Sequence, residues 1–172
     1  MIQKLQSYLS EYTVEIVSLS NIDQYESVFY SNEEYYRLTD GHTATRKDCV
    51  DTIEYGVDDP STYTIGVSQN GEPVAFLSVI AGYPQTTTLY IGLLLIYDNF
   101  KRQSIGTKII SALRKIAHQL NFSDMQLSVQ DNNIAGYSFW KKVGFYEIAT
   151  CTCDGFNNLS MRCEINKPEK LQ

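Results

Sequence analysis

Residues 89–96 form a short run of almost entirely apolar side chains, and a polar turn and a long helical pattern follow them. The run ends at the polar pair Asp98-Asn99. Its length and composition predict a strand that is buried on both faces. From Ile105 to Leu120 the apolar residues recur at steps of three and four, which predicts an amphipathic helix. This part of the chain is therefore predicted to be strand, turn and helix.

Two cations, Lys101 and Arg102, and two small residues, Ser104 and Gly106, lie around the predicted turn. The first backbone N–H groups of a helix have no intrahelical acceptor, and the helix dipole adds positive potential there. Free N–H donors and cations at one helix N-terminus are the local chemistry of an anion site. A solvated loop is the alternative, but the position between a buried strand and a helix favours anion binding.

The length of 172 residues fits one domain, so we expect residues 1–172 to fold as a single domain. Residues 1–12 are expected to form a short helix or a loose N-terminal arm, and the polar residues 166–172 a frayed tail. No apolar run approaches the roughly 20 residues of a membrane-spanning helix, and the N-terminus lacks a signal-peptide core. We therefore expect a cytoplasmic protein without a membrane role.

Charge and cysteine usage argue against two further classes of partner. The net charge is −6, whereas nonspecific nucleic-acid binding needs clustered Lys and Arg that neutralise phosphates. We expect no nucleic-acid partner. The four cysteines include no Cys-x-x-Cys pair, and no His stands at zinc-ligand spacing from them. We therefore expect no metal site and interpret the cysteines as small hydrophobic residues.

The chain before residue 60 predicts one strand and two helices. Residues 13–19 alternate apolar and polar side chains, as a half-buried strand does. Helical spacing of apolar residues follows at residues 22–29 and again at residues 45–55. Between these helices, residues 31–42 mix carboxylates, aromatic rings and a histidine, and we interpret them as an irregular substrate loop.

The remaining segments predict an antiparallel meander and a crossover. The Asn-Gly pair at residues 70–71 between two apolar runs is a strong hairpin signal. A helix capped by Asp131, Asn132 or Asn133 is expected to end at Gly144. The predicted strands are residues 13–19, 62–68, 74–80, 89–96, 125–129, 145–148 and 159–165. This order predicts an α/β (α+β) fold: a single mixed, mostly antiparallel central sheet of about seven strands with helices on both faces.

Two segments of the chain, residues 101–106 and residues 133–145, resemble motifs of the GNAT superfamily of acyl-CoA-dependent N-acyltransferases. In that family a Gln/Arg-x-x-Gly-x-Gly/Ala turn opens the helix that receives the coenzyme A pyrophosphate. Here the turn reads Lys-Arg-Gln-Ser-Ile-Gly, so Lys101 stands for the usual Gln or Arg and Ser104 for the first Gly. Backbone N–H donors remain in this turn, and the hydroxyl of Ser104 adds one more donor.

The second segment is aligned on the Gly-Phe pair at residues 144–145. This places Asn133 at the usual Asn of the family, Gly136 at its usual Ala and Trp140 at its usual Tyr. In the family this Tyr often protonates the departing coenzyme A thiolate. The indole N–H of Trp140 is not an acid at neutral pH, so it serves only as a hydrogen-bond donor.

The resemblance implies acetyl-CoA as co-substrate and a set of residues that bind it. In the family the strand ending at Ile96 splays from its neighbour, and its backbone holds the pantetheine arm. A backbone N–H near Leu94 is placed to stabilise the tetrahedral oxyanion of acyl transfer. The implied cofactor-binding residues are Leu94, Ile96, Lys101, Arg102, Gln103, Ser104, Ile105, Gly106, Thr107, Asn133 and Trp140.

The groups that would move protons are less clearly marked. Tyr137 lies one helical turn before Trp140 and is the candidate for its acid role. A base must keep the attacking amine neutral, but residues 89–96 contain no carboxylate. Candidate bases therefore come from the substrate loop, and we predict Glu34 as the catalytic base. The other candidates there are Glu33, Asp40 and His42, and for all of them a solvated surface role is the alternative.

Two functions follow, from different classes. The first is an N-acetyltransferase that transfers an acetyl group from acetyl-CoA directly to a primary amine of a small molecule or peptide. The alternative is a non-catalytic acyl-CoA-binding or sensing module, which Trp140 and the missing strand carboxylate suggest. A different nucleotide-binding protein is disfavoured because the turn lacks a Gly-Lys-Ser/Thr ending. A homodimer is possible through the C-terminal hairpin, where Leu159, Met161 and Ile165 are apolar.

Overall fold

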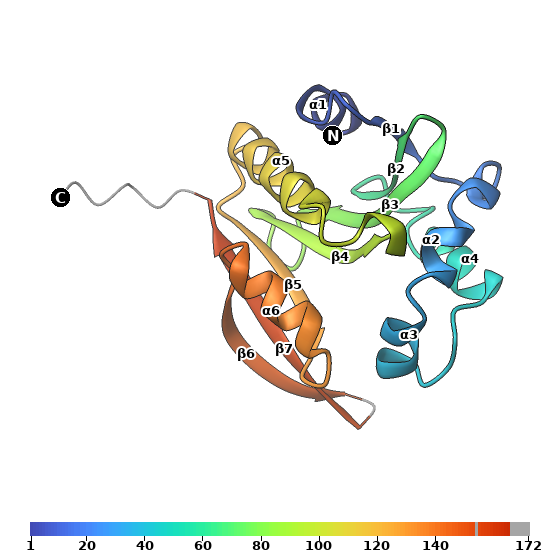
Figure 1. Cartoon of the computed structure of the whole chain (residues 1–172). Helices are drawn as coiled ribbons and strands as arrows, with labels where there is room; N and C mark the ends of the chain where they lie inside the picture. Colours follow the sequence, from blue (N-terminus) through green and yellow to red (C-terminus); the bar gives the residue numbers. More distant parts are fainter. Residues whose placement is uncertain (154, 166–172) are drawn as a thin grey trace.

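The computed structural model describes residues 1–153 and 155–165, and Figure 1 shows a central sheet flanked by helices. The prediction for the tail at 166–172 lies outside these residues. The helices are α1 (Ile2–Tyr8), η1 (Ile22–Gln24), α2 (Glu26–Tyr30), α3 (Glu33–Thr39), α4 (Arg46–Glu54), η2 (Asp98–Phe100), α5 (Ile105–Gln119) and α6 (Ile134–Lys142). The strands are β1 (Thr13–Ile16), β2 (Thr62–Gln69), β3 (Glu72–Ala81), β4 (Thr88–Ile96), β5 (Asp124–Gln130), β6 (Tyr146–Cys153) and β7 (Phe156–Glu164).

The seven strands form one mixed sheet in the order β1-β2-β3-β4-β5-β7-β6. Only the β4–β5 pair is parallel, and the other neighbours are antiparallel. The predicted sheet, including the β2–β3 hairpin, is confirmed. Asn70 and Gly71 both have positive φ, at 53° and 83°, as a two-residue turn in this twist requires. None of the helices in the described ranges is long and apolar enough to cross a membrane.

Helices α1, α5 and α6 pack on one face of the sheet. The apolar stripe predicted for α5 is buried, but Leu120, just after its last turn, is 41% exposed. At the N-terminus the short-helix alternative is correct, because Leu5 of α1 is fully buried in the same core. Of the three caps considered for α6, Asn133 is the one used, and the helix ends at Lys142, two residues before Gly144, which has φ 97°.

On the other face of the sheet, residues of the helices α2, α3 and α4 form a second core cluster with Phe76 of β3 and Leu95 of β4. Here Phe29 packs edge-on against Phe76, with ring centroids 4.7 Å apart. Cys49 is fully buried in this cluster, as expected of a small hydrophobic residue. The irregular loop predicted for residues 31–42 is wrong for most of its length, because α3 is a helix. Tyr36 is the one buried residue of this short helix, so no apolar periodicity revealed it.

The C-terminal hairpin differs from its prediction in length and position. The β6 strand extends to Cys153 rather than to residue 148, and it forms the edge of the sheet. The β7 strand lies inside the sheet, between β5 and β6, and its Met161 is fully buried. Leu159 and Met161 therefore do not lie at the edge of the sheet, which β6 of the same hairpin forms, and a homodimer through this hairpin stays a prediction.

Candidate active site

The strands β4 and β5 part from each other halfway along their length. Their ladder runs from the pair Thr88 and Asp124 to the pair Ile91 and Leu127. Beyond it, β4 continues to Ile96 and β5 to Gln130 without pairing to each other. The predicted splay is therefore present. Because unpaired strand edges offer N–H and C=O groups to an extended ligand, this gap is the first element of the candidate site.

A β-bulge marks the place where β5 departs. On the β3 side Ser78 lies opposite Leu93, and Val79 lies opposite Ile91, so Gly92 is an extra residue in β4. A bulge bends its strand and increases the local twist. The bend at Gly92 therefore gives a structural reason why β4 and β5 do not remain paired.

The backbone of Leu94 and Ile96 faces the gap. The N–H of Tyr97 donates to the carbonyl of Val74 on β3, at 2.9 Å. Since backbone groups alternate sides along a strand, those of Ile96 and Leu94 point away from β3. The Ile96 carbonyl accepts a hydrogen bond from Nδ2 of Asn32 at 3.0 Å. No strand of the described chain is paired to Leu94 on this side, so its N–H and C=O are open to a ligand.

The turn after β4 presents backbone donors at the start of α5. Ser104 adopts the left-handed conformation, with φ 63°, and its side chain makes no capping bond. The first helical bond runs from the N–H of Lys108 to the carbonyl of Ser104. The N–H groups of Ile105, Gly106 and Thr107 therefore have no intrahelical acceptor. Three donors at the positive end of a 15-residue helix form a fitting place for a phosphate group.

The side chains of this turn have different roles. Lys101 forms an ion pair with Asp98, and Nε2 of Gln103 donates to the carbonyl of Asn99 at 2.9 Å. Arg102, also with φ 63°, is exposed and takes part in none of the ion pairs found in the described part of the chain. Arg102 is therefore the turn cation that is available to an anionic ligand.

Gly106 lies at the junction of the turn with the gap. It is buried, and a Cβ on it would lie 3.9 Å from Cγ1 of Ile96 and would also meet the ring of Phe139 from α6. The structure thus brings the predicted residues Ile96 and Gly106 together. It also adds Phe139, which the sequence motifs did not single out.

Asn133 is used to begin α6. Its Oδ1 accepts a hydrogen bond from the N–H of Gly136 at 2.9 Å. A Cβ on Gly136 would lie 2.6 Å from Nδ2 of Asn133, which is closer than side chains approach. The Asn133 cap therefore leaves no room for the methyl group of an alanine at position 136, which explains why a glycine stands there. The Nδ2 of Asn133 is not used in the cap. Cofactor binding by Asn133 stays a prediction.

The two aromatic candidates on α6 lie in different surroundings. Trp140 is only 9% exposed and packs between Phe139 and Phe145, with ring centroids 4.9 and 5.4 Å away. Tyr137 donates its hydroxyl to Glu147 on β6, and this bond raises the pKa of Tyr137. A raised pKa keeps the phenol protonated at neutral pH. Both predicted roles remain predictions, and the hydroxyl of Tyr137 would have to leave Glu147 to act as an acid.

Two of the candidate bases on and after α3, Glu33 and His42, already have hydrogen-bond or ion-pair partners. Glu33 pairs with Arg37 on the surface, and Nδ1 of His42 donates to the Thr43 carbonyl while its Nε2 lies 3.7 Å from Asp48. The Thr43 contact is the main cause of the raised pKa of His42. Glu34 is exposed on α3. A catalytic role of Glu34 stays a prediction.

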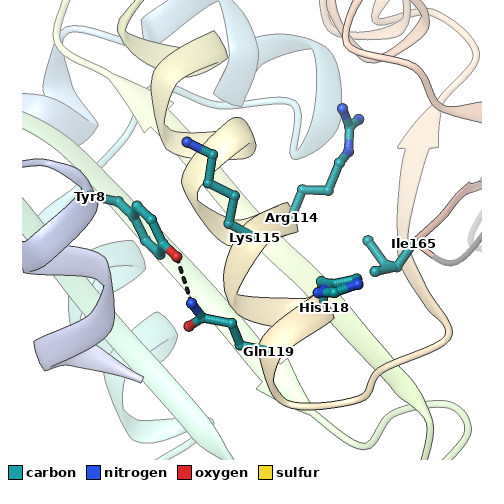
Figure 2. Close-up of a pocket in the computed structure, with 6 residues that line it drawn as sticks. All are labelled: Tyr8, Arg114, Lys115, His118, Gln119 and Ile165. Atoms are coloured by element: carbon teal, nitrogen blue, oxygen red, sulfur yellow. Dashed lines mark hydrogen bonds between the residues drawn. The ribbon is translucent and has the colours of Figure 1, made fainter.

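Two shallow depressions lie between α1 and α5. The first, of about 430 Å³, reaches from Ser104 and Thr107 to Lys115. Figure 2 shows the second, of about 300 Å³, where Nε2 of Gln119 donates to the hydroxyl of Tyr8. Two of its cations already have partners: Lys115 lies over the Tyr8 ring, and Arg114 donates to the Val143 carbonyl. Neither depression is lined by Leu94 or Ile96, although the first shares Ser104 and Thr107 with the turn. The unpaired strand ends and the free N–H groups beside them are the reason to place the candidate active site at the gap.

The sequence matches one protein family over more than half of its length. The model of the Acetyltransferase (GNAT) family matches residues 23–145. The chain belongs to the GNAT acetyltransferase family. The predicted family and the prediction of an acyltransferase enzyme are confirmed at this level. A search of curated protein sequences found no significant match.

Solved structures of acetyltransferases share the fold of this GNAT chain. An acetyltransferase from Thermus thermophilus is 20% identical, with a TM-score of 0.75 over 89% of this chain and 96% of that chain. The ribosomal-protein-S18-alanine N-acetyltransferase from Escherichia coli is 14% identical, with a TM-score of 0.65 over 94% and 98%. PaiA N-acetyltransferase from Thermoplasma acidophilum, in complex with coenzyme A, is 13% identical, with a TM-score of 0.64 over 89% and 98%. The predicted GNAT-like fold is confirmed.

Proposed function

We propose that the chain transfers an acetyl group from acetyl-CoA to a primary amine of a small molecule or peptide. One observation carries this proposal: the gap between β4 and β5 beyond Ile91 opens beside the free N–H groups at the start of α5. An extended arm fits an open strand edge, and a pyrophosphate fits a helix N-terminus. Family membership and the coenzyme A complex of PaiA support the same donor.

The residues that would hold the donor divide into two groups. The backbones of Leu94 and Ile96 would bind the pantetheine arm, with the Ile96 carbonyl already paired to Asn32. The turn and the start of α5 would bind the phosphates. These residues are Lys101, Arg102, Gln103, Ser104, Ile105, Gly106 and Thr107, and Asn133 and Trp140 are proposed on the α6 side. Residues 1–172 would act as one domain.

The chemistry would be direct attack by the neutral amine on the thioester carbonyl. The N–H of Leu94 would stabilise the developing oxyanion, since a fixed donor there needs no reorganisation. Tyr137 is the proposed acid for the thiolate and Glu34 the proposed base. No covalent acyl-enzyme is required, so a Ser-His-Asp arrangement is not needed.

The proposed acceptor is an amine, either of a small molecule or of a peptide. The Escherichia coli relative is named for an alanine of a ribosomal protein, which makes peptide amines worth testing here. Calorimetry with coenzyme A and thiol release from acetyl-CoA across a panel of amines and N-terminal peptides test the proposal. Absence of coenzyme A binding by the unmodified chain would contradict it.

The alternative is a non-catalytic acyl-CoA-binding or sensing module. The buried Trp140 at the usual Tyr position favours it, because an indole cannot protonate a thiolate. Coenzyme A binding without thiol release from any amine would support this alternative. Steady turnover with a single amine would remove it.

A further inference from the structure

The ends of β4 and β5 do not pair with each other, but β4 is hydrogen-bonded to the N-cap residue of α3, and β5 to the last turn of α3. On the β4 side, Nδ2 of Asn32 donates to the Ile96 carbonyl at 3.0 Å. On the β5 side, Nε2 of Gln130 donates to the Thr39 carbonyl at 3.1 Å, and Nδ2 of Asn132 donates to the Leu38 carbonyl at 3.0 Å. The short helix α3 therefore spans the open end of the gap.

Asn32, which directly precedes α3, is built into this contact. It is only 6% exposed, and its Nδ2 also donates to the Val28 carbonyl of α2 at 2.7 Å. The neighbouring Ser31 accepts a bond from the N–H of Asp98 at 3.3 Å, at the start of the turn that leads to α5. The corner between α2 and α3 thus holds both the last residue of β4 and the beginning of the turn.

The contact acts on the groups that would bind the donor. The Ile96 carbonyl faces the gap, so a bond to it fixes the orientation of the peptide that follows β4. The N–H of Ile96 and the backbone of Leu94 belong to the same unpaired stretch. This stretch is paired to β3 on one side and has no partner strand on the side of the gap, where Asn32 is the buried side chain that bonds to it.

We propose that α3 is a strap that sets the width of the β4–β5 gap, and that Asn32 is a positioning residue for the acyl donor. This inference rests on the proposed function, because it assigns a role to the gap in binding acetyl-CoA. The strap holds β4 through Asn32 and β5 through Gln130 and Asn132. Loosening either end lets the open edge of β4 move relative to the start of α5, where the phosphates would bind.

The test is a comparison of Asn32→Ala with Asn21→Ala. Asn21 is a matched control, since its Nδ2 donates to the Ile16 carbonyl at the end of β1, at 3.1 Å, away from the gap. We expect Asn32→Ala to raise the KM for acetyl-CoA and the Kd for coenzyme A by about tenfold, because small displacements of bound reactants are costly. The KM for the amine should stay within about twofold, and Asn21→Ala should leave all three values unchanged.

A second variant covers the case in which Asn32→Ala does not fold. Asn132→Ala removes one bond of α3 at an exposed position beyond β5. It should raise the Kd for coenzyme A by about threefold while the thermal unfolding midpoint stays near that of the unmodified chain. An unchanged Kd in the folded Asn32 and Asn132 variants would overturn the strap. If the unmodified chain binds no coenzyme A, the proposed function itself fails, and the two failures are distinguishable.

Discussion

The ring of Phe139 occupies the position that a side chain on Gly106 would need. A Cβ on Gly106 would lie 3.1 Å from Cζ and 3.3 Å from Cε2 of this ring. The contact joins α6 to the first turn of α5, directly beside the gap. The sequence motif explains Gly106 by close approach of a pyrophosphate, and the structure adds a second reason, which is the packing of the two helices.

Gly106→Val should therefore destabilise the protein by about 1–3 kcal/mol, because it overpacks a closed contact. Adding Phe139→Leu should recover part of this loss, with a coupling energy of at least about 0.5 kcal/mol in a double-mutant cycle measured by urea unfolding. The coenzyme A affinity of the variants distinguishes the two reasons for the glycine, which are helix packing and space for the pyrophosphate. If the double variant regains stability without regaining coenzyme A affinity, the pyrophosphate also needs the space. Strictly additive effects of the two substitutions would contradict the proposed packing.

Ser104→Gly should stabilise the protein by up to about 1 kcal/mol, because Ser104 adopts a left-handed conformation that glycine adopts without strain. The substitution also restores the usual glycine of the family motif, so coenzyme A affinity should be kept. Asn121→Gly is the matched control, since Asn121 has φ 60° just beyond the other end of α5. Asn tolerates this conformation better than Ser, so the control should gain less in urea unfolding. A loss of stability in Ser104→Gly would contradict the prediction.

Arg102→Asn should weaken coenzyme A binding by about tenfold, because it removes the one turn cation that is not already paired in the described residues. Asn keeps the left-handed backbone conformation accessible. The difference from the unmodified chain should shrink as salt increases, since exposed charges are screened. Lys47→Asn on α4 is the control, and calorimetry at two ionic strengths is the measurement. Equal Kd values for Arg102→Asn and the unmodified chain would exclude Arg102 from the site.

Stability should fall in alkaline solution, because burial raises the pKa of several groups in the cluster between α2, α4 and the sheet. Burial raises the pKa of Cys49 from 9.0 to about 12 and that of Tyr35 from 10.0 to about 12. Burial, together with the carboxylate of Glu15, also raises the pKa of Tyr25. The folded state therefore keeps protons that the unfolded state releases. The contribution of these groups to the free energy of unfolding should be level well below pH 9.0 and should decrease from there towards pH 12.

Urea unfolding at several values between about pH 8 and pH 11 measures this decrease. Cys49→Ala removes the group with the lowest ordinary pKa, so the decrease should begin about one pH unit later in this variant. If the free energy of unfolding instead rises with pH over this range, the result would contradict the burial of these groups.

Much of the fold could be predicted because its periodic patterns are strong. The stripe of α5 and the Asn70-Gly71 turn each depend on neighbours within a few residues. The gap between β4 and β5 was implied by the family resemblance alone, since an apolar run does not show where pairing stops. The contact of Asn32 with Ile96 joins residues 64 positions apart, and no local signal marks it.

The errors have the same origin. The helix α3 fully buries only Tyr36, and side chains from β5 and the residues after it bond to its C-terminal end, so its sequence resembles a loop. The long β6 strand is exposed along its length where its side chains are described, so no alternation of apolar and polar residues extended the prediction beyond residue 148. Structure formed by distant partners leaves little local pattern.

The extra residue at Gly92 changes which side of β4 each leucine or isoleucine occupies. Before it, Leu89 and Ile91 pack with α5, whereas after it Leu94 and Ile96 take that side. Leu95 instead joins the cluster under α2 and α4. The strand thus carries two out-of-phase patterns joined end to end, and its sequence is uniformly apolar because both of its faces pack against a core cluster. Deleting this one glycine would exchange the side chains on the two faces of the strand beyond residue 92, so the single insertion decides which of the two core clusters each of these side chains joins.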